Sequence, residues 1–495
     1  MLLPASSNQA IGIGQYAIDF IAGRTGSVAA EVLDRVALFH LDSVACGIAA
    51  LAERLNAPTV LRAEALTYSR EDGATCLGGG RVAAEKAVAA NSSAVRELDA
   101  NGTNFGYNPR LGHVAGEFGH NDFYPVAVAA AQLSGADGAT TLRAMLCLDE
   151  IRGRLAEVFS LKDHKVDHVV HGAIAAAAAY GALRGATPEQ IESAIGLVVA
   201  HAIPFRAIRA GKQLSDSKGA SAAWSAETAV LASERAMRGF RGPADVFRNP
   251  EAIFCLFEPP GQPECSPFDL NLSDGGEDFA VMGMHFKLGI YEHQSAGAID
   301  GLITVLQQQP QLLNNLNSIQ RVLISIYEPA FGIIGDPAKR NPRTRQSADH
   351  SMVYIIATLL RKAAESGKAD WLQLMLEPAD YDESAILNPQ TREWMNRIEF
   401  MHGGPEFDQK YPQGIPTRMK IEHSGGSLDS GLVMFPLGHA RSDPHLWRPI
   451  LMEKIERFAR IGVDNVSELL ADLQGIGTMS ASKVRSLYDF PIRNV

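Results

Sequence analysis

Apolar residues recur at helical spacing through the first half of the chain. They stand three and four positions apart, which is the pattern of amphipathic helices rather than of strands. The pattern predicts helices over 27–51, 83–98, 124–135, 140–159, 173–183, 187–204 and 219–239. Thr187, Pro188 and Glu189 supply an N-cap, a first helical residue and an acidic first turn. Alanine and glycine are dense in these segments, so we expect a tightly packed bundle.

The pattern changes after about residue 250. Residues 247–279 are rich in proline, glycine and acid and are typical of a linker or long loop. Beyond them, 318–330 is typical of a strand, and 417–437 has two alternating runs around Ser-Gly-Gly, which predict a hairpin. The helical segments of this half are 297–308, 347–367, 445–462 and 465–473. The fold class is therefore mainly α, with a smaller α+β segment after a helical domain.

Composition and charge narrow the function classes. The chain has 495 residues and a formal net charge of −11, which argues against nucleic acid or an anionic membrane as the main partner. A small anionic substrate needs only a local basic pocket. The five cysteines are scattered without C-x-x-C spacing, which argues against zinc or iron–sulfur sites and fits a reducing, cytoplasmic compartment. We find no transmembrane-length apolar run and no signal peptide.

Histidines are the first candidates for chemistry. His168 and His171 stand three apart where the alanine-rich run begins, with Asp167 as a plausible N-cap of that helix. They are either catalytic or packed against neighbouring helices. Asp167 and the two histidines as metal ligands form an alternative, but three neighbours at a helix start give poor geometry. We therefore expect no metal.

Two other segments carry candidate polar groups. Residues 205–218 hold Arg206, Arg209, Lys212 and Lys218 directly before a helix predicted to start near Gly219, which favours an anion site. A solvated loop is the alternative. Asp99, Asn101 and Thr103 follow a helix, where simple turn chemistry is also possible. The glycines at 78–80 lack the Gly-Lys-Ser/Thr ending of a phosphate loop and predict a turn entering a helix.

Several segments, taken in order, resemble the MmgE/PrpD family. They are LFHLDSVACGIAAL, TCLGGGRVAAEKAVAANSSAVRELDANGT, FGHNDFYPVAVAAA, NPRTRQSADHSMVYIIA and FPLGHAR. The resemblance runs over nearly the whole chain and lies closer to the dehydratase branch than to the decarboxylase branch. It implies a large all-helical domain, residues 1–275 and 435–495, and a smaller α+β lid domain, residues 276–434. It also implies a homodimer with the site between the two domains.

The resemblance assigns seven residues to the site, and the basic segment before Gly219 adds Arg209. Asp99, His120, His168 and Lys218 match catalytic positions, and Thr103, Arg209, Lys287 and His350 are assigned to substrate binding. His171 matches no family position, so we expect it to pack. One segment departs from the family: FKLGIYEHQSAG lacks the usual proline, and its histidine has moved to His293. This departure leaves the contribution of the lid, and the exact substrate, open.

The family's reactions handle a proton or a carboxylate next to a carboxylate-stabilised carbon, which requires a base and cations. The resemblance thus implies a 2-methylcitrate dehydratase-like lyase of propionate catabolism, acting on a hydroxytricarboxylate without a cofactor. His168 is the candidate base, His120 the candidate acid, and Asp99 orients a histidine or takes a proton. Lys218 and Arg209 hold carboxylates. The order of acid and base stays open, as do an epimerase, a decarboxylase or a metabolite-binding member.

Overall fold

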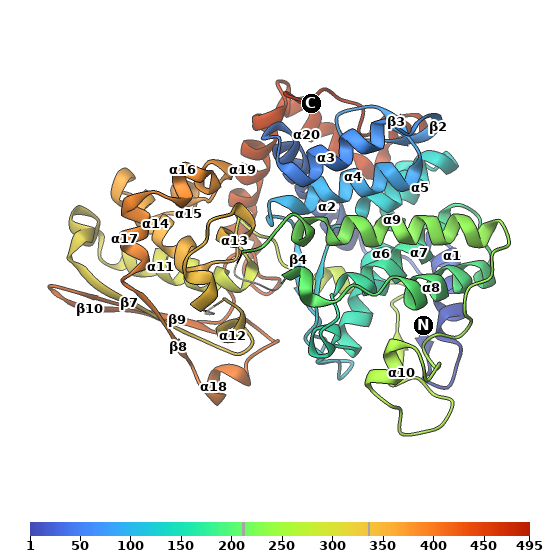
Figure 1. Ribbon diagram of the computed structural model, residues 1–495, viewed down its shortest axis with the longest axis horizontal. Helices are drawn as coiled ribbons and strands as arrows, with labels where there is room; N and C mark the ends of the chain where they lie inside the picture. The colour runs from blue at the N-terminus through green and yellow to red at the C-terminus, as the bar shows by residue number, and fades with distance from the viewer. Residues whose placement is uncertain (210–212, 335–336) are drawn as a thin grey trace.

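The computed structural model describes residues 1–209, 213–334 and 337–495. Helices form most of the chain, and a smaller α+β portion contains its largest sheet, which confirms the predicted fold class. Figure 1 shows the N-terminal helices on the right and that sheet with its covering helices on the left. Lys212 of the predicted anion site lies outside the described residues.

The helices of the first half pack against each other as one layer-on-layer body. They are α1 (Gln9–Ile21), α2 (Ala30–Ala52), α3 (Asn56–Leu66), α4 (Ala84–Glu97), α5 (Tyr124–Ser134), α6 (Gly138–Val158), α7 (Val169–Leu183), α8 (Pro188–His201), α9 (Ser217–Met237) and the short α10 (Ile253–Phe257). Helix α9 packs against α4, α7 and α8, and α6 packs against α7. Alanine lines these contacts with near-zero exposure, which permits the close approach.

The start signals of α8 hold in detail. Thr187 Oγ1 accepts from Gln190 N at 3.3 Å, and Gln190 Oε1 accepts from Thr187 N at 2.9 Å, a reciprocal capping box. The start of α7 differs from the prediction, because His168 and not Asp167 is the N-cap residue. Asp167 Oδ1 still accepts from Val169 N at 3.3 Å. Helix α9 begins at Ser217, two residues before the expected start.

Four short strands of the first half were not predicted. They pair as β2 (Ser69–Thr75) with β3 (Arg81–Val82), and β4 (Thr103–Phe105) with β5 (Phe118–His120). Strand β1 (Leu2–Leu3) also pairs with β6 (Leu270–Asn271), inside the segment expected to be a linker. All of these strands except β2 have two or three residues, too short to show alternation, and β2 is missed because its first four residues are polar and exposed rather than alternating.

The α+β portion has one four-stranded sheet in the order β10-β9-β7-β8. Strand β7 (Ile319–Ile326) pairs antiparallel with β9 (Thr417–His423) and parallel with β8 (Ile398–His402), and β9 and β10 (Gly426–Val433) form the predicted hairpin. Helix α11 (Ala296–Gln308) lies on β9 and β10. Gly297 makes this approach possible, because a Cβ there would lie 2.4 Å from Thr417 Oγ1.

The remaining helices cover the sheet or connect its strands. They are α12 (Ala330–Ile334), α13 (Arg345–Ala348), α14 (Met352–Ser366), α15 (Trp371–Leu374), α16 (Glu383–Ile386), α17 (Pro389–Met395), α18 (Pro405–Asp408), α19 (Pro444–Gly462), α20 (Val466–Gln474) and α21 (Ala481–Arg485). Helix α19 packs against α2, where buried Lys454 pairs with Asp42 at 2.7 Å. The chain thus returns to the N-terminal helices after the sheet.

Among the described helices, α2 alone has the length and apolar composition of a membrane span. In the structure, 89% of its apolar window is buried against other parts of the protein. A core helix of this kind passes the same test of length and composition.

Candidate active site

A polar cavity lies between the N-terminal helices and the α+β portion. It encloses about 580 Å³, including its mouth. Its walls come from the end of α4, from β4 and β5, from the start of α7, and from segments after residue 286. Seven of the eight predicted site residues line it: Asp99, Thr103, His120, His168, Arg209, Lys287 and His350. The sequence prediction therefore brings together residues that are up to 251 positions apart.

Two histidines face each other in this cavity. The ring centroids of His120 and His168 are 5.1 Å apart; His168 is buried and His120 is half-buried. Neither nitrogen of His168 nor Nδ1 of His120 has a hydrogen-bond partner in the described part of the chain. Burial lowers the pKa of both rings well below the ordinary value. Both rings are therefore neutral near pH 7, and their nitrogens are available to a ligand.

The arginines of the predicted anion site have different roles in the structure. Residues Arg206–Arg209 form a 3₁₀ turn. Arg209 donates to buried Asp167 through Nε and NH2, and its NH2 also donates to Ser221 at 3.0 Å. Burial favours a neutral Asp167, but Arg209 outweighs burial and lowers the pKa of that carboxyl. Arg206 lines the cavity with a buried NH1 that has no partner among the described residues, so Arg206 has the donor for a substrate.

Asp99 is the centre of a buried ion network. Its carboxylate accepts from Arg96 and Lys287, and it lies 3.1 Å from Lys218 Nζ and 3.2 Å from His350 Nδ1. Burial alone would raise the pKa of Asp99, but these cations hold it well below its usual range. Asp99 therefore stays ionised, which supports orientation of a neighbouring group over uptake of a proton.

Lys218 does not line the cavity, unlike the other seven predicted residues. It lies behind Asp99, fully buried, with its Nζ 2.7 Å from Asp349 and 3.1 Å from Asp99. We expected the ammonium group of Lys218 to hold a substrate carboxylate, but it is already paired with the carboxylates of Asp99 and Asp349. Thr103 lines the cavity, and its hydroxyl donates to the carbonyl of Gly119 at 3.0 Å, within the β4–β5 pair.

One group of residues has the spacing of a metal site. Ligand atoms of Asp99, Asp349 and His350 lie within 4.8 Å of one another. Both carboxylates already pair with Lys218, so a divalent cation there would meet a fixed positive charge. His350 Nδ1 is also occupied, at 2.7 Å from Asp349. These contacts argue for an ion network rather than a metal centre, and the expectation of no metal stays a prediction.

The sequence reasoning missed several residues of the cavity. Arg96, Gln294, Phe105 and Phe118 line it, and Lys339 does so as well. Gln294 has no hydrogen-bond partner for either side-chain amide atom in the described part of the chain. Arg96 stands one helical turn before Asp99, and that spacing could have identified it. Gln294 belongs to the polar run from Glu292 to Ser295 inside an apolar stretch, which is the available signal.

Glu292 and His293, two residues of the divergent segment FKLGIYEHQSAG, also line the cavity. Burial raises the pKa of Glu292 to about 7, and its carboxylate accepts from Gln294 N at 2.9 Å. His293 has no hydrogen-bond partner for either ring nitrogen among the described residues. The divergent segment therefore still delivers its acid and its histidine to the site.

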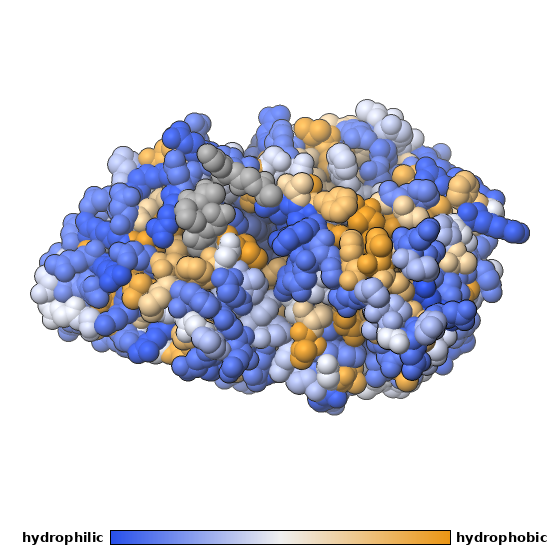
Figure 2. All heavy atoms as spheres, turned by 60° about the horizontal axis from the view of Figure 1, so that its bottom comes forward, coloured by the Kyte–Doolittle hydropathy of each residue, from blue (hydrophilic) through white to orange (hydrophobic). Residues whose placement is uncertain are grey.

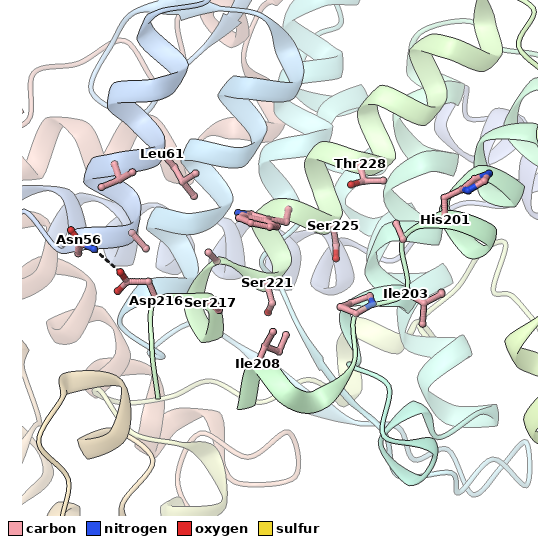
Figure 3. Close-up of a pocket in the computed structure, with 16 residues that line it drawn as sticks. Asn56, Leu61, His201, Ile203, Ile208, Asp216, Ser217, Ser221, Ser225 and Thr228 are labelled. Carbon is pink, nitrogen blue, oxygen red and sulfur yellow. Dashed lines mark hydrogen bonds between the residues drawn. The ribbon is translucent and has the colours of Figure 1, made fainter. Parts of the chain in front are cut away.

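A second, apolar cavity opens between α3, the end of α8 and α9. Figure 3 shows its lining side chains, with Leu61, Ile203 and Ile208 around the opening and a hydrogen bond from Asn56 to Asp216. Trp224 lines it with 66% of its surface exposed. On the face drawn in Figure 2, apolar side chains gather to the right of centre amid a largely hydrophilic surface. Exposed apolar area of this kind is typical of contact surfaces.

Comparison with protein families gives two matches that together span most of the chain. The MmgE/PrpD N-terminal domain matches residues 18–265, and the MmgE/PrpD C-terminal domain matches residues 291–470. The first match contains Asp99, His120 and His168. The second contains His350 and the sheet.

Three curated proteins with similar sequences come from fungi. The chain is 23% identical over 280 residues to cis-aconitate decarboxylase of Aspergillus terreus, covering 54% of this chain and 53% of that protein. It is 24% identical over 301 residues to the cis-aconitate decarboxylase-like protein oryM of Aspergillus oryzae, covering 60% and 58%. It is 23% identical over 335 residues to alkylcitrate dehydratase phiI of a fungal species (strain ATCC 74256), covering 66% and 62%. The matches thus span little more than half the length of these relatives.

Proposed function

The chain belongs to the MmgE/PrpD family, and from that premise we propose that it is a lyase that removes water from a hydroxytricarboxylate. The favoured substrate is 2-methylcitrate, which would give the protein a place in propionate catabolism. The observation that carries the proposal is the pair of neutral histidines, His120 and His168, that face each other in a cavity with several cationic side chains. Similarity to an alkylcitrate dehydratase supports the same reaction class.

The geometry suits an elimination reaction. A neutral imidazole accepts the proton of the carbon next to a carboxylate, and the imidazolium so formed supplies the proton that the second imidazole delivers to the departing hydroxyl, so that both rings end neutral. His168 and His120 are close enough to act on the two ends of one short carbon unit. Among the described residues, NH1 of Arg206 has no hydrogen-bond partner, so it can donate to the substrate carboxylate as negative charge develops there. No step in this scheme requires a metal or an organic cofactor.

The ion network around Asp99 supports this site, and it includes Lys218, Lys287 and His350. Lys287 and Lys218 bring two positive charges to Asp99, and Asp99 and Asp349 fix Nδ1 of His350. With Nδ1 held by carboxylates, Nε2 of His350 is left to face the cavity. We propose that His350 contacts the substrate in this way and that Lys218 acts by fixing Asp99.

The test is an assay of alkene formation by chelator-treated enzyme. The enzyme is incubated with 2-methylcitrate and, separately, with citrate, and ultraviolet absorbance of the conjugated alkene is followed. A rise that is absent in His168→Ala supports the proposal, and the ratio of the two rates identifies the better substrate. No rise with either compound contradicts it.

A decarboxylase is the second candidate, because two of the relatives are named as cis-aconitate decarboxylase or as similar to it. The same histidines would then protonate the carbon that loses carbon dioxide. Release of carbon dioxide from cis-aconitate, without alkene formation from 2-methylcitrate, favours this alternative. Deuterium incorporation without a new alkene favours an epimerase, and a rise in melting temperature without turnover favours a metabolite-binding member.

We also propose that the protein is a homodimer that buries the apolar cavity of Figure 3. Trp224 stands on α9 among the small residues Ala220, Ser221 and Ser225, which would let a second copy approach closely. Light scattering after size exclusion tests this: Trp224→Glu should give the monomer mass. Leu256→Glu, an equally drastic change at an exposed residue outside the cavity, should leave the dimer intact. A monomeric wild type contradicts the proposal.

A further inference from the structure

A third cavity lies beside the active-site cavity, and the proposed reaction makes no use of it. We call it the rear cavity. It encloses about 550 Å³ and is lined by residues 104–107, Glu157, 280, 282–283, His285, 412–413 and 439–441. Phe105 lines both cavities, so they share a wall. The rear cavity contains His439 and Arg441 of the FPLGHAR segment, which the sequence singled out and which the proposed reaction leaves unexplained.

The turn that carries His439 is fixed by a close backbone contact. Gly438 has a φ of +89°, and a Cβ there would lie 2.3 Å from the carbonyl oxygen of Phe286. Phe286 N donates to the Gly438 carbonyl at 2.8 Å. Only glycine fits this position without displacing the backbone. This contact fixes the backbone of the turn, and the turn sets the position of His439, the fifth residue of FPLGHAR.

Three histidine rings stack between the two cavities. The ring centroids of His285 and His439 are 4.1 Å apart, and those of His285 and His293 are 5.0 Å apart with nearly parallel planes. His293 lines the active-site cavity, whereas His285 and His439 line the rear cavity. A group bound in the rear cavity would therefore lie one ring away from the active site.

Backbone hydrogen bonds fix the tautomers of the two rear rings. Nδ1 of His285 accepts from Ala440 N at 2.9 Å, and Nδ1 of His439 accepts from Arg441 N at 3.1 Å. A nitrogen that accepts a hydrogen bond carries no proton, so each neutral ring has its proton on Nε2. Burial lowers the pKa of His285 and lowers that of His439 to about 3, which keeps both rings neutral.

The rear cavity consequently has hydrogen-bond donors that lack acceptors among the described residues. Nε2 of His439 is buried in a side chain that is only 2% exposed, and it has no partner among the described residues. Arg441 contacts the rings of Tyr107 and Phe435 and has no carboxylate partner in the described part of the chain. An unsatisfied buried donor beside a cation is costly unless a ligand pairs with it.

The one carboxylate among the described lining residues already has partners outside the cavity lining. Glu157 lies 3.1 Å from Arg154 NH1 and 3.1 Å from His113 Nδ1. Because Glu157 is paired with these groups, it does not pair with the guanidinium of Arg441, which lies in the same lining as the Nε2–H of His439. Small oxyanions have the complementary charge and several acceptor atoms.

We propose that the rear cavity binds a small oxyanion, a carboxylate or a phosphate, through Arg441 and the Nε2–H groups of His439 and His285. This site is distinct from the proposed active site and does not depend on the reaction assigned there.

The experiment is calorimetric titration of the full chain with two probes, inorganic phosphate and tricarballylate, a tricarboxylate without a hydroxyl group. Arg441→Gln removes the charge at an exposed position. His439→Asn keeps an acceptor for Arg441 N but deletes the Nε2 donor. Arg448→Gln removes an exposed arginine on α19 that does not line the cavity, as the matched control. Arg206→Gln removes binding in the active-site cavity and so identifies that site.

We expect at least one probe to bind at a site whose affinity falls at least about tenfold in Arg441→Gln and in His439→Asn. Binding should be unchanged in Arg448→Gln and should persist in Arg206→Gln. The probe that binds identifies the anion as carboxylate or phosphate. Wild-type binding in Arg441→Gln, or no site for either probe beyond the one lost in Arg206→Gln, overturns the proposal. If His439→Asn does not fold, the affinity of Arg441→Gln, a change at an exposed residue, tests the proposal by itself.

This outcome is separable from that of the dehydration assay. Absence of alkene formation with an intact Arg441-dependent anion site would refute the proposed reaction and leave the rear site standing. Alkene formation with no such site would do the reverse.

Discussion

The first turn of α7 places two histidines in two different regions of the molecule. His168 lines the active-site cavity opposite His120 and has no hydrogen-bond partner for either nitrogen among the described residues. His171, three residues later, is buried among helices, and its Nε2 lies 3.0 Å from the Phe159 carbonyl. Burial lowers the pKa of both rings, that of His171 to about 4. A lowered pKa therefore does not distinguish a site residue from a packed one, and Nδ1 of His171 also lacks a partner among the described residues, so access to the cavity is what separates the two histidines.

The largest effect should come from removing the imidazole of His168. In His168→Ala we expect a folded protein with turnover reduced about 10²- to 10⁴-fold, because the loss is that of a general base. Steady-state kinetics measure the loss, and circular dichroism with thermal melting checks the fold. Turnover like that of the wild type would remove His168 from the mechanism and erase its difference from His171.

A smaller effect should follow when the free guanidinium donor of the cavity is removed. Arg206→Gln should lower kcat/KM about 10- to 100-fold, since one charge-assisted hydrogen bond to a substrate carboxylate is lost. Arg241→Gln, at an exposed arginine outside the cavity, should leave kcat/KM unchanged. Equal kinetics for the two variants would show that Arg206 does not contact the substrate.

Local pattern accounts for most of the fold and for part of the site. The long helices were predictable because their apolar periodicity extends over several turns, and the β9–β10 hairpin because it alternates around a turn. Strands β4 and β5 were not, because three residues cannot show a period and the hydrogen bonds of Thr103 N and O go to His285. The boundaries of the lid domain at 276 and 434 remain predictions.

The site residues were identified by resemblance, but their contacts required the structure. Lys287 reaches Asp99 across 188 positions, and Lys218 reaches Asp349 across 131. No spacing rule reports contacts at that separation. Asp99 also has a φ of +52°, a left-handed conformation that Asp adopts more readily than most residues. For the same reason the sequence analysis assigned Arg209 to substrate binding, although two of its N–H groups donate to Asp167 in the structure.

The pH dependence of kcat/KM should separate the two regions further. Because the pKa of His168 lies well below 6.5, the neutral base persists as pH falls from about 8 to 6.5, and activity should stay flat over that range. The loss on the acid side should begin only below 6.5. Glu292, with a pKa raised to about 7, titrates inside this range and is the group that would add a limb near pH 7, so Glu292→Gln is the control. An acid limb at 6.5 or above that persists in Glu292→Gln contradicts a buried histidine base.

The smallest effect on turnover should come from His171→Gln. The Gln side chain can still donate to the Phe159 carbonyl, and His171 does not line the active-site cavity, so kcat/KM should change less than about threefold. Stability should fall by about 1 kcal/mol, because a buried hydrogen bond and its packing are altered, and chemical denaturation measures this. A loss of turnover comparable to that of His168→Ala, without a comparable loss of stability, would mean that both histidines of the turn act in the reaction. In that case access to the cavity would no longer separate catalytic from packed histidines in this fold.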